Sequence, residues 1–286
     1  MSRIARALSF LELLLLLGSL LRPPTRRTES FEPLYLPRAS ILHAFGKPIL
    51  PAIVDYYWLE SLQTLGGAAT AAEFRSLADY GNLISDLDSR FTYPNRFLGG
   101  AIPFDLGREQ WVNTAESTAL MTRALSHASS DYYLRVLLAY NLSYFDKKYQ
   151  EAAQLLEEAS RIPNCPLYVR ALATRLYAHA GHFENALAFA QSLAATSTDP
   201  EQRELFKRRI SEIQLERELR RVEEAAARFR SRTGRSPGRV ETLVEQGDLA
   251  PAPSDPLGGT ISLDERGVAH STSEQKRLAP FAPDHT

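Results

Sequence analysis

The fold is decided by Tyr133–Pro200, which reads YLRVLLAYNLSYFDKKYQEAAQLLEEASRIPNCP and then LYVRALATRLYAHAGHFENALAFAQSLAATSTDP. The two halves carry one pattern, repeated 34 positions later. The matched pairs are Leu138 and Leu172, Ala139 and Ala173, Leu142 and Leu176, Tyr149 and Phe183, Ala152 and Ala186, and Pro166 and Pro200. Apolar residues recur at helical spacing, and small residues recur where two helices must approach closely. Each half therefore predicts two packed helices.

A period of 34 residues built from two helices resembles the tetratricopeptide repeat. The turns Asp146–Tyr149 and Ala180–Phe183 end in the aromatic residue that this family places just before its second helix. Two positions depart from the family: Ser143 replaces the usual tyrosine, and Lys147 replaces the usual glycine. The resemblance implies a stack of helical hairpins. An ordinary helical bundle with the same spacing is the alternative.

In the tetratricopeptide family, the first helices of the hairpins line a concave groove that holds a peptide or a partner helix. Arginine and tyrosine side chains often carry the binding energy of such interfaces. By register alone, the candidate groove residues are Tyr132, Arg135, Tyr140, Asn141, Arg170, Thr174, Arg175 and Tyr177. The alternative is that these side chains form a solvated polar face. The family's clamp for peptide C-termini is not expected, because only Asn141 fits its lysine–asparagine set.

The expected fold class is all-α: a helical-hairpin solenoid with an N-terminal membrane anchor, a long capping helix and a small C-terminal α/β appendage. Residues 51–88 read as one hairpin, and residues 98–126 as a less regular pair with a loop near 103–110. The expected divisions are an anchor at 1–22, an extended linker at 23–50, the repeat domain at 51–200, the capping helix at 201–233 and the appendage with a flexible tail at 234–286.

Leu8–Leu21 form a leucine-rich run behind Arg3 and Arg6. A helix of this run spans roughly 21 Å, which is shorter than a bilayer core of roughly 30 Å. The run has the charged start and apolar centre of a secretory signal, but no A-x-A-like cleavage site follows it. The sequence favours an uncleaved membrane anchor through residues 4–21, with a soluble amphipathic helix as the alternative. Its short basic start predicts a bacterial inner-membrane protein with a periplasmic body.

Residues 201–232 contain neither glycine nor proline, and they carry two opposed apolar stripes, one around Phe206 and one from Leu215 to Phe229. We expect the first stripe to pack on the last repeat and the second on the C-terminal segment or on another chain.

After this helix, Asp255–Gly259 and a short hairpin resemble the C-terminal half of type II secretion pseudopilins. The run from Ala7 to Glu12 resembles the start of type IV prepilins. Both resemblances imply a subunit of a pilus-like apparatus.

Composition and motifs argue against nucleic-acid binding and against an enzyme. Thirty-three basic and 34 acidic residues predict no general attraction to nucleic acid. No phosphate-binding loop, nucleophile elbow or zinc-type cysteine pattern is present in the sequence, so no enzyme, cofactor or metal site is expected. The spacing of His179 and His182 could suit a metal, but no cysteine lies nearby and only Glu184 is close in sequence, so a solvated turn is the preferred interpretation. The sequence therefore predicts a membrane-anchored scaffold that binds proteins of a cell-envelope complex. The alternative is the pilus or secretion subunit.

Overall fold

The computed structural model describes residues 35–273 and 276–278, and most of them are helical. The α-helices are α2 (Ala39–Gly46), α3 (Leu50–Gly67), α4 (Ala71–Leu87), α5 (Tyr93–Ala101), α6 (Thr114–His127), α7 (Tyr132–Tyr144), α8 (Tyr149–Ser160), α9 (Leu167–His179), α10 (Phe183–Thr196), α11 (Pro200–Thr233) and α12 (Val240–Glu245). The strands are β1 (Phe104–Asp105), β2 (Trp111–Val112), β3 (Ile261–Leu263) and β4 (Ala269–Ser271). They form two antiparallel ribbons, β1–β2 and β3–β4. A short 3₁₀ turn, Lys47–Ile49, joins α2 to α3.

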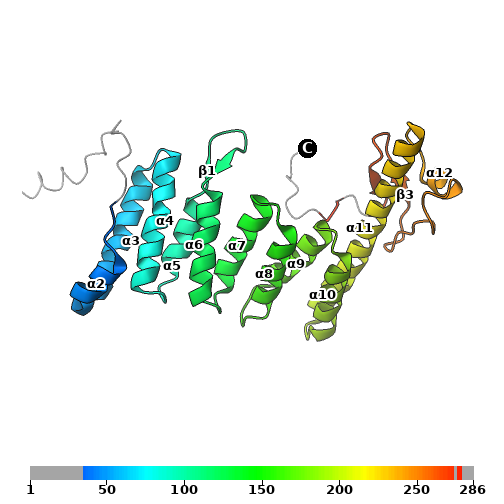
Figure 1. The fold of residues 1–286 in the computed structure, drawn as a ribbon. Helices are drawn as coiled ribbons and strands as arrows, with labels where there is room; N and C mark the ends of the chain where they lie inside the picture. Colours follow the sequence, from blue (N-terminus) through cyan, green and yellow to red (C-terminus); the bar gives the residue numbers. More distant parts are fainter. Residues whose placement is uncertain (1–34, 274–275, 279–286) are drawn as a thin grey trace, which may run out of the picture.

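Helices α2 to α11 lie side by side in one elongated row, and α11 stands at its end (Figure 1). Each helix packs on its neighbours in sequence, and α4 also meets α6, α5 meets α7 and α9 meets α11. The predicted hairpin at 51–88 is present as α3 and α4, and the two regular units are present as α7–α8 and α9–α10. The mostly helical fold class is confirmed.

Local sequence fixes where several helices begin. Thr70 and Glu73 form a capping box before α4, in which each side chain accepts a hydrogen bond from the other's backbone N–H. Asp131 accepts from the backbone N–H of Leu134 at the start of α7, and Asp199 caps α11 in the same way. Tyr149 and Phe183 are the first residues of α8 and α10, as the repeat pattern predicts.

Small residues set the close spacing of the row. Ala139, Ala152, Ala173 and Ala186, which the repeat pattern matches in pairs, are at most 2% exposed and belong to one core cluster. Gly99 lies against Met121, where a Cβ would come 2.6 Å from Met121 Cγ. The helices therefore approach one another through side chains too small to hold them apart.

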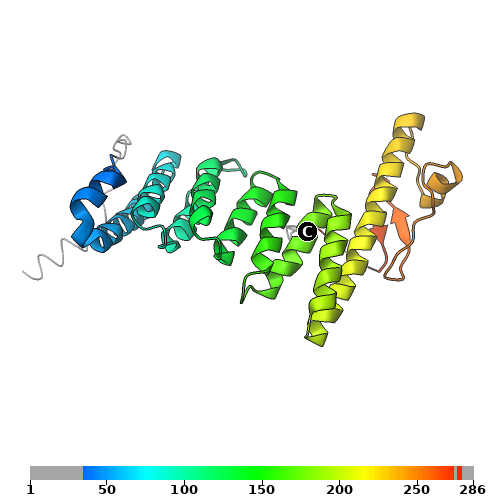
Figure 2. The same cartoon turned by 60° about the horizontal axis from the view of Figure 1, so that its bottom comes forward.

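The two stripes of α11 pack against different parts of the chain. Phe206 is fully buried with Leu193 and Ala194 of α10. Leu215, Leu219 and other residues of the second half form a separate core with α12 and the β3–β4 ribbon. Figure 2 shows this appendage on the side of α11 that faces away from the row. As predicted, the two halves of α11 pack on different partners, and the second half packs on the C-terminal segment of the same chain.

Two expectations about the ends of the chain are wrong where the structure describes them. The supposedly extended linker contains α2 at Ala39–Gly46, which packs on α3 and α4. The supposedly flexible tail is fastened at Arg277 and Leu278. Arg277 forms ion pairs with Glu216 and Glu223 of α11, and Leu278 is buried in the core cluster of the regular repeats.

The expected anchor, residues 1–22, and the first part of the linker lie outside the described residues. Among the helices that the structure does describe, none has the length and apolarity needed to cross a bilayer.

Candidate binding surface

Three of the candidate groove residues are buried and bonded inside the protein. Asn141 is 3% exposed and donates a hydrogen bond of 2.6 Å to Ser117 Oγ. Thr174 is fully buried and donates to the Ala171 carbonyl one turn earlier. The Tyr177 hydroxyl donates to Glu157 Oε2 at 2.8 Å, and burial, followed by this bond to a carboxylate, raises its pKa. Asn141 and Tyr177 join neighbouring helices and Thr174 bonds within its own helix, so none of the three lines an open groove.

The other five candidates reach the surface to different degrees. Tyr140 and Arg175 are exposed, whereas Tyr132 is half-buried against the core cluster. Arg135 lies along α7, pairs with Glu158 at 3.5 Å and donates to the Ser129 carbonyl. Arg170 is half-buried and points into a cleft between α8 and α10. The predicted set is therefore divided among the core, the surface and a cleft that the register did not predict.

Exposed apolar side chains gather on the first helix of each pair. We name the exposed side chains of α3, α5, α7 and α9 the first-helix face. Its large apolar members are Tyr56, Leu59, Tyr93, Phe97, Tyr133, Tyr140 and Tyr168. The second helices α4, α6, α8 and α10, all fully described, expose no large apolar side chain. Single exposed apolar residues are ordinary, but within the helices α3–α10 these large side chains occur only on alternate helices, which is not.

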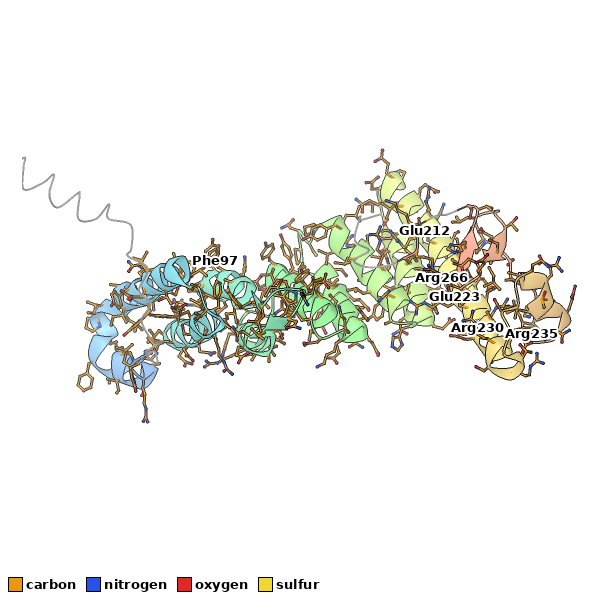
Figure 3. All side chains as sticks on the ribbon, turned by 90° about the horizontal axis from the view of Figure 1, so that it is seen from above. Phe97, Glu212, Glu223, Arg230, Arg235 and Arg266 are labelled. Atoms are coloured by element: carbon orange, nitrogen blue, oxygen red, sulfur yellow. The ribbon has the colours of Figure 1, made fainter. Side chains whose placement is uncertain are left out.

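Contacts among neighbours hold part of the first-helix face in place. The rings of Tyr93 and Phe97 stack at 6.4 Å, and both meet Trp58 edge-on at 5.8 and 5.6 Å. Phe97 projects at the edge of the row (Figure 3). The Arg96 guanidinium lies 5.6 Å from the centre of the Tyr133 ring and pairs with the buried carboxylate of Asp131. This links the face of α5 to that of α7.

A second group of aromatic rings lies at the other end of α7. The β1–β2 ribbon brings Trp111 to the end of this helix, where its ring centre lies 6.3 Å from Tyr144 and 5.3 Å from Phe145. Tyr140 and Tyr144 stack almost in parallel at 5.3 Å, and burial raises the pKa of Tyr140. The repeat pattern does not reveal this group, because Trp111 and Phe145 lie outside the matched repeat positions.

His179 and the acidic loop have protein partners. His179 packs edge-on against Tyr149 at 4.4 Å, and burial, followed by the charge of Arg220, lowers its pKa. Asp255 accepts hydrogen bonds from the Ser271 and Ser273 hydroxyls, which fasten its loop to β4. In residues 35–273 and 276–278, no group of histidine, cysteine, aspartate and glutamate residues could hold a metal ion.

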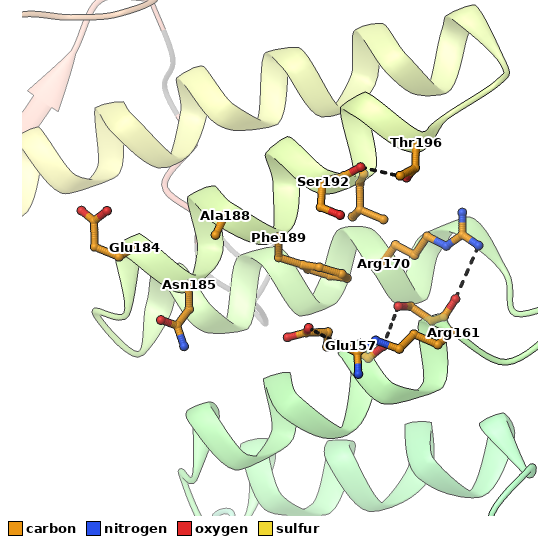
Figure 4. A pocket seen from close by; sticks show the side chains of 11 residues that line it. Glu157, Arg161, Arg170, Glu184, Asn185, Ala188, Phe189, Ser192 and Thr196 are labelled. Atoms are coloured by element: carbon orange, nitrogen blue, oxygen red, sulfur yellow. Dashed lines mark hydrogen bonds and ion pairs between the residues drawn. The ribbon is translucent and has the colours of Figure 1, made fainter.

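A cleft of about 860 Å³ lies on the second-helix side of the last pair (Figure 4). It is lined by Glu157, Ser160, Arg161, Arg170, Glu184, Asn185, Ala188, Phe189, Ser192, Leu193 and Thr196. Arg170 is the only one of the predicted groove residues among them. This cleft is therefore a different hollow from the groove expected along the first helices, which stays a prediction.

The comparisons with known proteins add no relative. No protein-family model matches the chain, and no curated protein or solved structure matches it either.

Proposed function

We propose that this chain is a protein-binding scaffold of the tetratricopeptide-repeat type, with its row of helix pairs forming a solenoid. The observation that carries the proposal is that, within the paired helices α3–α10, the large exposed aromatic and apolar side chains lie on the first helices α3, α5, α7 and α9 and not on the second helices. Tyrosine supplies a large contact area and a hydroxyl for hydrogen bonding, so it suits an interface that must also remain soluble when free. The ligand is a segment of another protein that lies across the first helices.

The ring contacts on the first-helix face support this role. Tyr93, Phe97 and Tyr133 are already ordered by Trp58 and Arg96 in the free protein. Binding to ordered side chains costs less conformational entropy than binding to mobile ones. A face of this kind can hold a partner without any catalytic group.

We further propose that the scaffold is anchored to a membrane through residues 4–21 and serves an envelope complex, with its body in the periplasm of a bacterium. This part rests on the leucine-rich sequence of Leu8–Leu21. Carbonate extraction of membranes tests it: the full chain is expected to stay in the pellet, and a chain lacking residues 1–22 is expected to be released. Release of the full chain by carbonate would contradict the anchor.

The pilus-subunit alternative stays a prediction from Glu12 and the Asp255 loop. It requires the chain to be cut after Ala7, which mass spectrometry of the purified protein tests. An intact N-terminus would rule it out.

The binding role is tested by purifying the tagged, detergent-solubilised full chain from its own cells and identifying what accompanies it. The test variant is Tyr133→Ser combined with Tyr168→Ser, two exposed changes on α7 and α9. The matched control is Leu205→Ser, an equally exposed apolar residue on α11. The same partners should accompany the wild type and the control and be lost from the double variant. Loss in the control alone, or in none, would contradict a first-helix binding site.

A further inference from the structure

The cleft on the second-helix side runs along one face of α10 from Glu184 to Thr196, with α8 as its opposite wall and Arg170 of α9 between them (Figure 4). Twelve helical steps of about 1.5 Å make this face roughly 18 Å long, which matches about five residues of an extended chain. The cleft is therefore long enough for a short peptide segment. It lies apart from the first-helix face described above.

The carboxylates of the cleft are neutralised within the protein. Glu157 pairs with Arg161 at 2.6 Å and accepts the Tyr177 hydroxyl at 2.8 Å. Glu184, at the other end, pairs with Arg217 of α11 at 3.1 Å. Both acidic lining residues thus have a basic partner, and Arg161 is already paired.

Arg170 lacks such a partner. Its Nε is buried and has no hydrogen bond, and its Nη2 reaches only the Ser160 carbonyl, at 3.5 Å. No carboxylate in the part of the chain that the structure describes lies within ion-pair distance of this guanidinium. A buried Nε–H without a hydrogen bond costs free energy, which an incoming carboxylate would recover by accepting from this guanidinium.

The wall beside Arg170 is apolar. Phe189 is half-buried and contributes to two core clusters, so its ring is held firmly. Ala188, Leu193 and the small polar side chains Asn185 and Ser192 flank it. The cleft therefore combines one unneutralised positive charge, one aromatic wall and a polar rim.

We propose that this cleft binds an acidic peptide segment of a partner protein, in which a glutamate or aspartate lies next to an aromatic or aliphatic residue. The carboxylate pairs with the Arg170 guanidinium, and the apolar neighbour packs on Phe189. An arginine fork can hold both oxygens of a carboxylate, which fixes the direction of the peptide. The scaffold would then have two separate binding surfaces on opposite helices of its pairs.

The experiment is a selection of random heptapeptides displayed on phage against the full-length, detergent-solubilised chain. Selected sequences are made as fluorescein-labelled peptides, each with a partner in which glutamine or asparagine replaces the acidic residue. Their affinities for the chain are measured by fluorescence anisotropy. Peptides with an acidic residue beside an apolar one should be enriched, and their neutral partners should bind about tenfold or more weakly, since the charge-assisted bond is lost.

The variants locate the site. Arg170→Gln should weaken binding of the acidic peptides about tenfold and abolish their preference over the neutral partners. Arg175→Gln, which changes an exposed arginine of the same helix α9, should leave the affinity within about twofold. Ala188→Trp fills the cleft from an exposed position without removing a core contact, and should also block binding. Circular dichroism of each variant checks that the chain is folded.

Two outcomes would overturn the proposal. One is a selection that shows no enrichment of acidic residues. The other is binding of the acidic peptides that survives both Arg170→Gln and Ala188→Trp in folded protein. Either result leaves the first-helix binding site untouched, because Tyr133 and Tyr168 take no part in this cleft.

Discussion

Lys147 and Gly181, which stand 34 positions apart, both adopt the left-handed backbone conformation, with φ of 57° and 81°. They occupy the same place in the turns between α7 and α8 and between α9 and α10. The backbone of the repeat thus demands a positive φ here in both units, although only the second unit has the glycine that adopts it without strain. Structural equivalence extends beyond the residues that match in sequence.

Lys147→Gly is therefore expected to stabilise the protein by about 0.5–1 kcal/mol, because a side chain in the left-handed region is strained. The change also removes a cation–π contact between Lys147 and Tyr144, worth about 0.5–1 kcal/mol at an exposed site, which offsets part of the left-handed strain of about 1–2 kcal/mol. Urea denaturation of the full chain measures the effect. Lys148→Gly is the matched control: with φ of −85°, this neighbour carries no left-handed strain, so the same change should not give this gain.

Gly99 and Gly100 offer a second matched pair. A Cβ at Gly99 would meet Met121 at 2.6 Å, whereas a Cβ at Gly100 would meet nothing within 4 Å. Gly99→Ala should cost about 1–3 kcal/mol through overpacking, and Gly100→Ala should be neutral or slightly stabilising because alanine favours the helix. Thermal unfolding of the two variants compares them. Equal melting temperatures would mean that α5 and α6 do not approach as closely as described.

A buried polar chain connects three helices in the middle of the row. Asn141 of α7 donates to Ser117 Oγ of α6, which in turn donates to the Gly99 carbonyl of α5. Ser117→Ala should cost about 1–3 kcal/mol, because it leaves both the Asn141 amide and the Gly99 carbonyl without their partner. Thr122→Ala on the same helix is the control, since Thr122 is exposed and bonds only within α6. Denaturation curves of the two variants should differ by most of that amount.

The fastening of the C-terminal segment should depend on pH. Glu216 is buried, which alone would raise its pKa, but the bonds from Arg277 and Arg220 outweigh burial and lower it. A carboxyl whose pKa is lower in the folded state stabilises the protein fully above its unfolded value of about 4.3, and the contribution disappears as the pH falls through the folded value. The free energy of unfolding of wild type should therefore fall below pH about 4.3 more steeply than that of Glu216→Gln.

The same cluster should show coupling between its members. Arg277→Met alone leaves the Glu216 charge buried at 5% exposure and should cost about 1–3 kcal/mol. Arg277→Met combined with Glu216→Met should cost less than the sum of the two single changes, because the buried Glu216 charge that Arg277→Met leaves behind is removed as well. Additive effects in this double-mutant cycle would contradict the ion pair.

The regular units could be predicted because their information is local. Leu138 and Ala152 recur 34 positions later as Leu172 and Ala186, and Tyr149 and Phe183 mark the helix starts. The burial of Tyr177 and Thr174 could not be predicted from such local patterns. Their position on α9 predicts one exposed face, but α8, α10 and α11 all pack on this helix and leave little of it free.

The fastening of the tail was missed for a different reason. Arg277 contacts Glu216 from 61 positions away in the sequence, and no local sequence pattern predicts such a contact. Proline and polar residues near the end of a chain are typical of a flexible tail. The cleft at Arg170 likewise depends on which carboxylates are already paired, and only the folded structure provides that information.

The most direct test of the central claim is site-specific photocrosslinking in the organism's own cells. A photoreactive phenylalanine analogue is placed at Tyr133 or Tyr168 on the first-helix face, or at Ala119 or Thr122, which are exposed on α6. If the first helices hold the partner, Tyr133 and Tyr168 should give the same discrete crosslinked protein, and the two α6 positions should give none. Crosslinks from the two α6 positions, with none from Tyr133 and Tyr168, would contradict the claim.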